Sequence, residues 1–153
     1  MKSHIFTSIA VLLAALALPA HADGFRVVKS PLLEEECGAC HMVFPPQMLQ
    51  AESWQALMDG LPQHFGSDAS LDKKRRVAIA DFLIRNSGRR DTRAPDGKPL
   101  LRLTETAHFK KEHRKIAPAI WQRASIKSAA NCSACHTGAA AGDYDEDSIR
   151  IPK

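Results

Sequence analysis

The sequence predicts an all-α, mostly helical fold in two lobes, and three observations support this. No segment shows the apolar–polar alternation that is typical of a strand. Several segments space their apolar residues at helical intervals and end in proline or glycine. Residues 89–99 are rich in Arg, Asp, Pro and Gly and lack large apolar side chains, as linkers do. We therefore expect one lobe from residues 23–92 and another from residues 93–153.

The first 22 residues read as a cleaved signal peptide. Lys2 provides the charged start, residues 5–18 form a short apolar run, and Ala20-His21-Ala22 supplies the small residues of a cleavage site. The apolar run is too short to span a bilayer comfortably. No later segment is apolar enough to cross a membrane, so we expect an exported protein without membrane insertion.

The first predicted helix, Leu32–His41, carries three glutamates near its start, where acidic side chains suit the helix dipole. Pro45-Pro46 then stops it. Ser70 and Thr104 are candidate N-caps for two later helices. The remaining predicted helices cover residues 48–58, 72–86, 105–116 and 119–126.

Two C-x-x-C-H motifs, Cys37-Gly38-Ala39-Cys40-His41 and Cys132-Ser133-Ala134-Cys135-His136, use every cysteine of the chain. This pattern is typical of c-type haem attachment, in which two cysteines form thioethers and the histidine is the proximal iron ligand. We expect two covalently bound haem c groups, one per lobe, held by Cys37, Cys40, Cys132 and Cys135. The proximal ligands are then His41 and His136.

Other interpretations of the cysteines are weaker. A zinc site usually has about 15–20 residues between its C-x-x-C pairs, whereas nearly the whole mature chain separates these two. Thioredoxin-like redox motifs require a βαβ context, which is not visible. Two disulfides would suit an exported protein but leave the histidine after each pair unexplained. Haem attachment outside the cytoplasm fits a bacterial periplasm.

The sixth ligand of the first haem is expected to be His64. It lies in the loop Gln63-His64-Phe65-Gly66, beyond the helix that follows the first motif, and Gly66 permits close backbone approach. Met48 and Met58 are the alternatives, although each also fits ordinary core packing. Met42 is adjacent to His41 and cannot reach the opposite face of the ring.

His108 and His113 compete for the second haem. They are five residues apart on one predicted helix and point about 140° apart. His113 shares a stripe with Phe109 and Ile116, whereas the side of His108 is charged. The apolar stripe should face inward, which favours His113. His108, or an open iron site, remains the alternative.

Two bis-histidine haems favour low reduction potentials and leave no coordination position for a substrate. The sequence thus predicts outer-sphere electron transfer and not an enzyme. One alternative is the haem-bearing subunit of a larger periplasmic reductase, such as the small subunit of nitrate reductase. Another is a small dihaem peroxidase or reductase with an open iron. A sensor or haem-storage role is neither supported nor excluded.

The formal net charge is +4, and loss of Lys2 with the signal peptide leaves +3. Haem propionates would bring the holoprotein close to neutrality, so we expect no nucleic-acid binding. The chain is 6% aromatic and 25% charged. Two haems would supply much of its buried apolar surface, so we expect the apoprotein to fold poorly.

Four stretches resemble the small periplasmic dihaem cytochromes c, often called DHC. They are CGACHMVFPP from Cys37, SWQALMDGLPQHFG from Ser53, TETAHFKKEHRKI from Thr104, and the closing stretch 131–152 with NCSACHTG and DYDEDSIRIP. The resemblance implies two bis-histidine haems, with His41 paired to His64 and His136 to His113. It also implies an electron carrier between a quinol-linked membrane cytochrome, as donor, and a soluble oxygen-binding monohaem cytochrome c.

Overall fold

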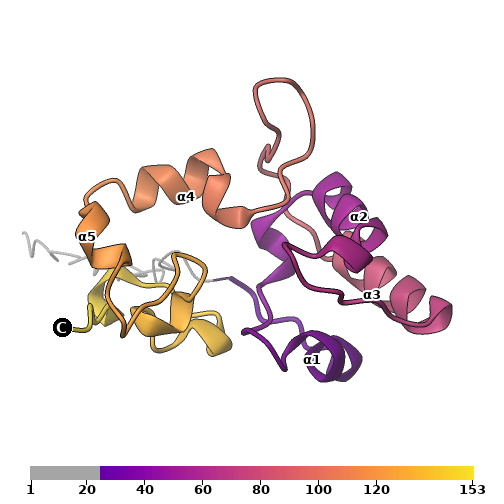
Figure 1. Ribbon diagram of the computed structural model, residues 1–153, viewed down its shortest axis with the longest axis horizontal. Helices are drawn as coiled ribbons and strands as arrows, with labels where there is room; N and C mark the ends of the chain where they lie inside the picture. The colour runs from indigo at the N-terminus through magenta and orange to yellow at the C-terminus, as the bar shows by residue number, and fades with distance from the viewer. Residues whose placement is uncertain (1–24) are drawn as a thin grey trace, which may run out of the picture.

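The computed structural model describes residues 25–153 (Figure 1). The predicted signal peptide, residues 1–22, lies outside the described residues. Across residues 25–153 no helix is long and apolar enough to cross a membrane.

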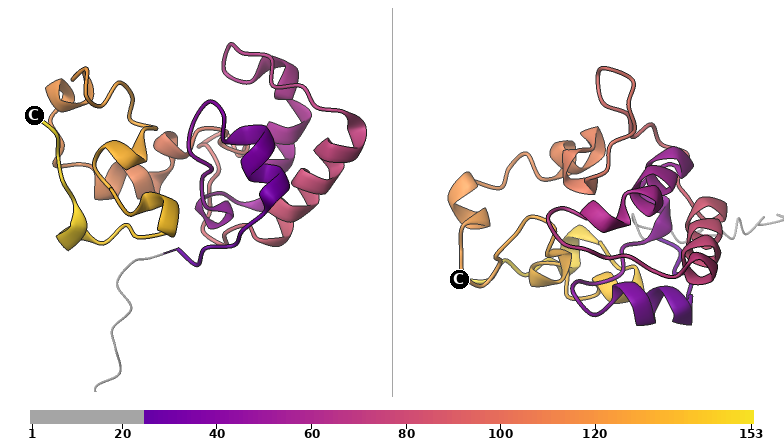
Figure 2. Two further views of the ribbon diagram at one scale, coloured as in Figure 1. Left: turned by 90° about the horizontal axis from the view of Figure 1, so that it is seen from below. Right: turned by 45° about the vertical axis from the view of Figure 1, so that its right-hand side comes forward.

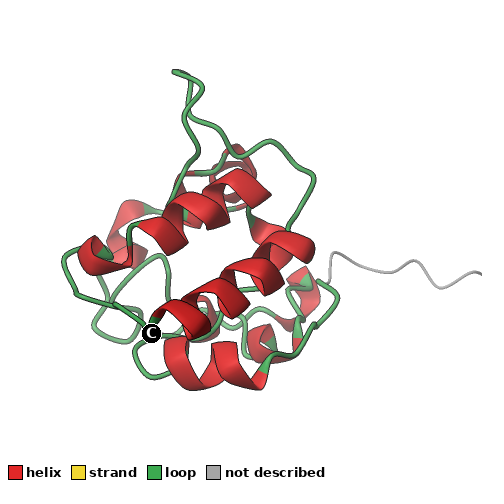
Figure 3. Ribbon diagram, turned by 90° about the vertical axis from the view of Figure 1, so that its right-hand side faces the viewer, coloured by secondary structure: helices red, strands yellow, loops and turns green. Residues whose placement is uncertain are grey.

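The described chain is helical, which confirms the all-α prediction. Its five α-helices are α1 (Pro31–Cys37), α2 (Ala51–Asp59), α3 (Lys73–Arg85), α4 (Ala107–Glu112) and α5 (Pro118–Trp121). Single 3-10 turns follow the chain between and after them: η1 (Pro46–Met48), η2 (Leu61–Gln63), η3 (Leu103–Glu105), η4 (Cys132–Ala134), η5 (Ala139–Ala141) and η6 (Glu146–Ser148). Within residues 25–153 there is no strand, only two isolated bridges (Figure 3).

The helices form two groups, with α1 to α3 on one side and α4, α5 and the C-terminal turns on the other (Figures 1 and 2). The loop between α3 and α4 joins the groups. We refer to residues 25–92 as the first lobe and residues 93–153 as the second. Arg93 lies against Glu52 of α2, with its Nη2 3.0 Å from the carboxylate, and Leu103 packs against the core of the first lobe. The start of the second segment thus contacts the first lobe.

The first lobe has a hydrophobic core of its own, formed mainly where α2 packs on α3. Its members are Leu33, Leu49, Trp54, Leu57, Met58, Leu61, Ile79, Ala80 and Leu83. The Trp54 Nε1 donates a hydrogen bond of 2.7 Å to the Pro46 carbonyl, so the indole is satisfied although buried. This contact holds the turn after the first haem motif against α2. Met58 belongs to this core, as expected of an ordinary packing residue.

Ion pairs connect α1 to α3. Arg75 of α3 pairs with Glu35 at 3.0 Å and also with Glu36. Arg76 pairs with Asp59, at the end of α2, at 2.9 Å. These pairs are at least partly exposed and contribute little stability individually, but those of Arg75 orient α1, whose last residue is the first haem-motif cysteine.

The second lobe has almost no core. Of its apolar residues only Ile126 and Ala139 are buried. Its α-helices have six and four residues, too short to be stable without packing. Its own buried side chains thus contribute little packing to this lobe.

Several helix ends differ from the predictions because local hydrogen bonds decide them. Asp72, and not Ser70, caps α3 by accepting from the backbone N–H groups of Lys74 and Arg75. Thr106, and not Thr104, caps α4 by accepting from Phe109 N. The predicted helix 32–41 ends already at Cys37, where Gly38 is the C-cap, and not at the Pro45-Pro46 pair. Helix α2 begins at Ala51 and not at Met48. The predicted helices 105–116 and 119–126 are also shorter, and the segment of the second motif forms only a 3-10 turn. Propensity could not distinguish between equally good caps two residues apart.

Replacing Gly88 with alanine is expected to destabilise the protein. The Gly88 N–H donates to the Leu49 carbonyl at 2.8 Å, and an added Cβ would lie 2.1 Å from the backbone carbonyl oxygen of Gln47. Relieving this clash should cost about 1–3 kcal/mol. Denaturant unfolding of the holoprotein measures the loss, with Arg89→Ala, an exposed neighbour, as control. Equal stability of the two variants would contradict the close approach.

Candidate functional site

The first haem motif begins at the C-terminus of α1, where Cys37 is the last helical residue. The His41 Nδ1 donates to the Met42 carbonyl at 2.7 Å, and Phe44 stacks on the ring with centroids 5.0 Å apart. With its proton on Nδ1, the imidazole presents the lone pair of Nε2 to a metal. Cys40 and His41 are exposed, so this site opens on the surface.

His64 follows η2 in a tight turn. Phe65 and Gly66 both have positive φ, 54° and 97°, and Ser67 N donates to the His64 carbonyl at 3.1 Å. A left-handed phenylalanine is uncommon and costs conformational energy, and the Arg102 guanidinium lies 4.0 Å over its ring. The turn brings His64 to His41, with ring centroids 6.3 Å apart and planes inclined by 23°.

Burial lowers the pKa of His64, and the neighbouring His41 and Arg102 lower it further. The imidazole is therefore neutral at neutral pH, which is the form that binds a metal. Neither Met48 nor Met58 is placed as His64 is: Met58 is in the core, and Met48 lines the cavity of the other lobe.

The second haem motif is held by the C-terminal segment. Arg150 N donates to the Cys135 carbonyl at 2.9 Å, and the Tyr144 ring lies 5.2 Å from that of His136, centroid to centroid. Burial and His113 lower the pKa of His136, while Asp143 acts in the opposite direction. Burial also raises the pKa of Tyr144 well above its usual range, so the phenol stays protonated.

His113 caps the C-terminus of α4, and its Nδ1 donates to the Phe109 carbonyl at 2.9 Å. The Phe109 ring stacks on it at 4.0 Å, and Trp121 lies 5.8 Å away. Its ring centroid is 6.1 Å from that of His136, with planes inclined by 74°. The structure thus brings the predicted pair together from distant positions in the chain.

His108 also lines the cavity between these elements, but its Nδ1 lies 3.8 Å from the Glu112 carboxylate. His113 instead directs its ring at His136 with the same Nδ1-to-carbonyl arrangement that His41 shows. The ring separation therefore favours His113 over His108 as the partner of His136. The helix-face argument does not account for this, because α4 ends at Glu112 and both histidines line the cavity.

Both histidine pairs have the separation that one shared metal ion requires. A metal–imidazole bond of about 2 Å, with the ring centre about 1.1 Å beyond the nitrogen, places two ligating rings about 6.2 Å apart. The observed separations are 6.3 and 6.1 Å. A cavity of about 430 Å³ lies beside the second pair. The Tyr144 hydroxyl and His136 Nδ1 are buried without a hydrogen-bond partner in the described structure, as expected where a bound group completes the packing.

The other cysteine interpretations find no support in the described residues. None of the four cysteines forms a disulfide. Over residues 25–153, no group of three or more His, Cys, Asp or Glu side chains is arranged to hold a metal ion. The chemistry present is two cysteine pairs and two facing imidazole pairs, which fits two haems.

Comparison with known proteins identifies the family. The sequence model of the dihaem cytochrome c family matches residues 33–144. The chain belongs to the dihaem cytochrome c family. This cytochrome therefore contains two c-type haems, and its family is one of electron-transfer haem proteins.

Solved structures of dihaem cytochromes c are similar to this chain. DHC from Rhodobacter sphaeroides is 42% identical, with a TM-score of 0.68, over 78% of this chain and all of that one. A dihaem cytochrome type c from Shewanella baltica OS155 is 31% identical, with a TM-score of 0.71, over 82% of this chain and 95% of that one. No curated protein matches the chain.

Sequence reasoning missed several residues of the sites. Phe44 on His41 and Tyr144 beside His136 were not singled out, and neither was a direct contact between the two motifs. The Ser133 hydroxyl, inside the second motif, lies 3.3 Å from the Met42 sulfur, next to the first. These partners are separated by 91 residues, and no sequence pattern indicates them. The contact places the two haem attachment segments side by side.

Proposed function

We propose that this dihaem cytochrome is a periplasmic electron carrier in which each iron is closed by two histidines and no substrate binds. Cys37, Cys40, Cys132 and Cys135 would hold the haems covalently. His41 and His64 would ligate the first iron, and His136 and His113 the second. The observation that supports this most directly is the pair of ring separations, 6.3 and 6.1 Å.

The residues of the chain would keep the ligands ready for electron transfer without rearrangement. The carbonyl groups of Met42 and Phe109 hold the Nδ1 protons of His41 and His113, which orients each ring and raises its basicity as a ligand. Stacking of Phe44 and Phe109 limits rotation of the same rings. Haem supplies a one-electron iron couple whose potential is lowered by two imidazole ligands. Ligands that do not move between oxidation states keep the reorganisation small.

The contact between the motifs supports transfer within the molecule. The Ser133 hydroxyl lies 3.3 Å from the Met42 sulfur; Ser133 is inside the second haem attachment motif, and Met42 directly follows the first. The two haems should then exchange electrons quickly, and the protein would deliver electrons singly from either lobe.

Export to the periplasm and the partners are parts of the same proposal. A quinol-linked membrane cytochrome would be the donor, and a soluble oxygen-binding monohaem cytochrome c would be the acceptor, as the family resemblance implies. Rapid-mixing experiments with the reduced protein and such an acceptor would show oxidation at both haems. Oxidation that is no faster than with an unrelated haem protein would contradict this choice of acceptor.

The closed iron sites can be tested with the purified protein. We expect two low-spin ferric signals by electron paramagnetic resonance, and an unchanged optical spectrum when carbon monoxide is added after reduction. The rings of the two pairs differ in inclination, 23° against 74°, so the two low-spin signals should be distinct. A high-spin signal, or carbon monoxide binding by the native protein, would contradict the proposal and favour an enzyme.

Variants provide the positive control. His64→Ala and His113→Ala should each open one iron, so that each binds carbon monoxide at a single haem. The comparison shows that the native protein resists carbon monoxide because the sites are closed and not because the gas fails to enter.

A further inference from the structure

We infer that Arg90, a residue of the first lobe, binds a carboxylate of the haem attached to the second lobe. This inference rests on the proposed function, because it requires a haem beside His113 and His136. It assigns Arg90 as a positioning residue and makes the second haem a link between the lobes.

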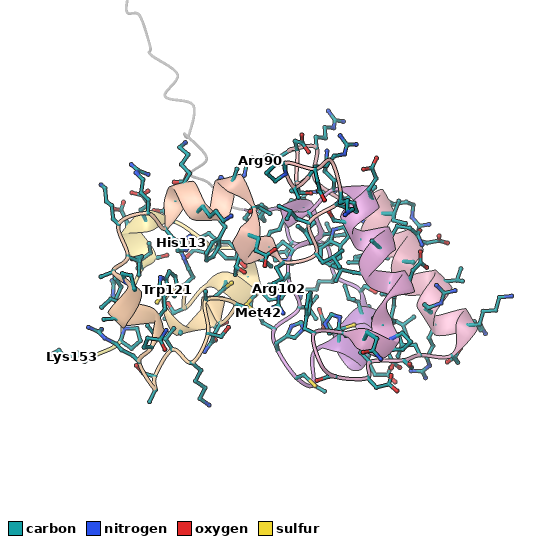
Figure 4. All side chains as sticks on the ribbon, turned by 45° about the horizontal axis from the view of Figure 1, so that its top comes forward. Met42, Arg90, Arg102, His113, Trp121 and Lys153 are labelled. Carbon is teal, nitrogen blue, oxygen red and sulfur yellow. The ribbon has the colours of Figure 1, made fainter. Side chains whose placement is uncertain are left out.

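Arg90 lines the cavity of about 430 Å³ that also contains Cys132, Cys135, His136 and His113. All four of these belong to the second lobe, whereas Arg90 precedes the junction at residue 92. Figure 4 shows Arg90 where the first lobe meets α4. Arg90 therefore borders the second haem site from the other side of the lobe boundary.

The backbone on both sides of Arg90 is fixed to the first lobe. Gly88 N donates to the Leu49 carbonyl at 2.8 Å. On the other side, the Thr92 hydroxyl accepts from Gln50 N at 3.1 Å and lies 3.2 Å from the Ser53 hydroxyl. Thr92 is buried. The backbone at Arg90 is thus held in place by hydrogen bonds on both sides, which lowers the entropic cost of binding a partner.

The charges of the cavity also favour this role. Arg90 is the one Lys or Arg among the described lining residues, whereas Glu112, Asp145, Glu146 and Asp147 are acidic. Two haem propionates would add negative charge beside these four carboxylates, so a neighbouring cation would be favourable. A guanidinium binds a carboxylate with two parallel hydrogen bonds, which adds geometric selectivity.

Arg90 is also available for a new partner. Arg93, from the same connecting segment, is engaged by Glu52 through Nε at 3.1 Å and Nη2 at 3.0 Å. In the described part of the chain no carboxylate lies within ion-pair distance of Arg90. Arg89 is exposed, as Arg90 is, but does not line the cavity, which makes it a matched control.

A cation beside a propionate near the iron stabilises the electron-rich ferrous state. Arg90→Gln should therefore lower the midpoint potential of the second haem. We expect about a three- to tenfold shift in its one-electron equilibrium constant, or about 30–60 mV, with the first haem unchanged. Arg90→Lys should recover much of the potential, because it keeps the charge, but not the bidentate geometry.

The experiment is spectroelectrochemical titration of the native protein, Arg90→Gln, Arg90→Lys and Arg89→Gln, with resonance Raman spectra of the propionate bending modes. The variant His113→Met, whose ligand change shifts the potential of the second haem, identifies which midpoint belongs to that haem. A lowered second midpoint and a shifted propionate mode in Arg90→Gln, with a smaller fall in potential in Arg90→Lys and none in Arg89→Gln, would support the inference. Arg90→Gln behaving like Arg89→Gln would overturn it.

Failure of the inference and failure of the proposed function give different results. If Arg90→Gln has no effect while both haems remain low-spin and inert to carbon monoxide, only the role of Arg90 is wrong. If the native protein binds carbon monoxide, the closed-iron proposal itself is wrong, whatever the potentials of the Arg90 variants.

Discussion

His113→Met is expected to raise the reduction potential of the second haem substantially and to leave the first unchanged. Methionine is a weaker donor to ferric iron than imidazole and so favours the ferrous state. Axial ligands set haem potentials over a span of about 0.8 V, so we expect a rise of about 0.1 V or more. Methionine has an unbranched, flexible side chain, so we expect it to take the place of His113, which follows the last residue of α4.

Spectroelectrochemistry of the native protein and of the variant measures this shift, and the near-infrared band of methionine-ligated ferric haem verifies the new ligand. His108→Met is the matched control, since it makes the same chemical change five residues earlier. The His108 Nδ1 lies 3.8 Å from Glu112, and the control should leave both potentials near their native values. A raised potential in His108→Met but not in His113→Met would exchange the two assignments. If His113→Met changed the potential of the first haem alone, the assignment of His113 to the second haem would be wrong.

Removing the second haem is expected to unfold the second lobe while the first lobe stays folded. The double variant Cys132→Ala, Cys135→Ala abolishes covalent attachment there. All nine residues of the buried apolar cluster lie between Leu33 and Leu83, and the second lobe contributes only Ile126 and Ala139 to the buried apolar residues of the described chain. A haem burying on the order of 400 Å² of apolar surface would contribute about 10 kcal/mol, comparable with the stability of a whole domain.

Trypsin digestion followed by mass spectrometry tests this expectation, because the second lobe has many exposed basic residues: Lys110, Lys111, Arg114, Lys115 and Lys127. The variant should contain one haem per chain and be cleaved quickly at these positions, while residues 25–92 survive. The reciprocal variant Cys37→Ala, Cys40→Ala should lose less helix, because the α2–α3 core remains. A second lobe that resists trypsin as well as the native one would show that its side chains suffice.

The short-range parts of the sites were predictable from the sequence. A C-x-x-C-H motif encodes its chemistry in five consecutive residues, so the number of haems and the attachment cysteines did not depend on the fold. The family comparison confirms the two haems. Helix identity was also predictable, because apolar spacing acts locally. The ends of the helices were not predictable, since Asp72 and Thr106 are the N-caps although equally suitable residues lie nearby.

The sequence by itself determined the all-α class, the two cofactors and a short list of histidines that could complete the iron sites. Only the tertiary structure decided which imidazoles face one another, because that depends on where separate segments meet. His64 reaches His41 through a left-handed turn at Phe65 and Gly66. The tertiary structure also placed Arg90 in the cavity of the other lobe and Ser133 on Met42. Such contacts join residues far apart in the chain, so no local sequence pattern indicates them.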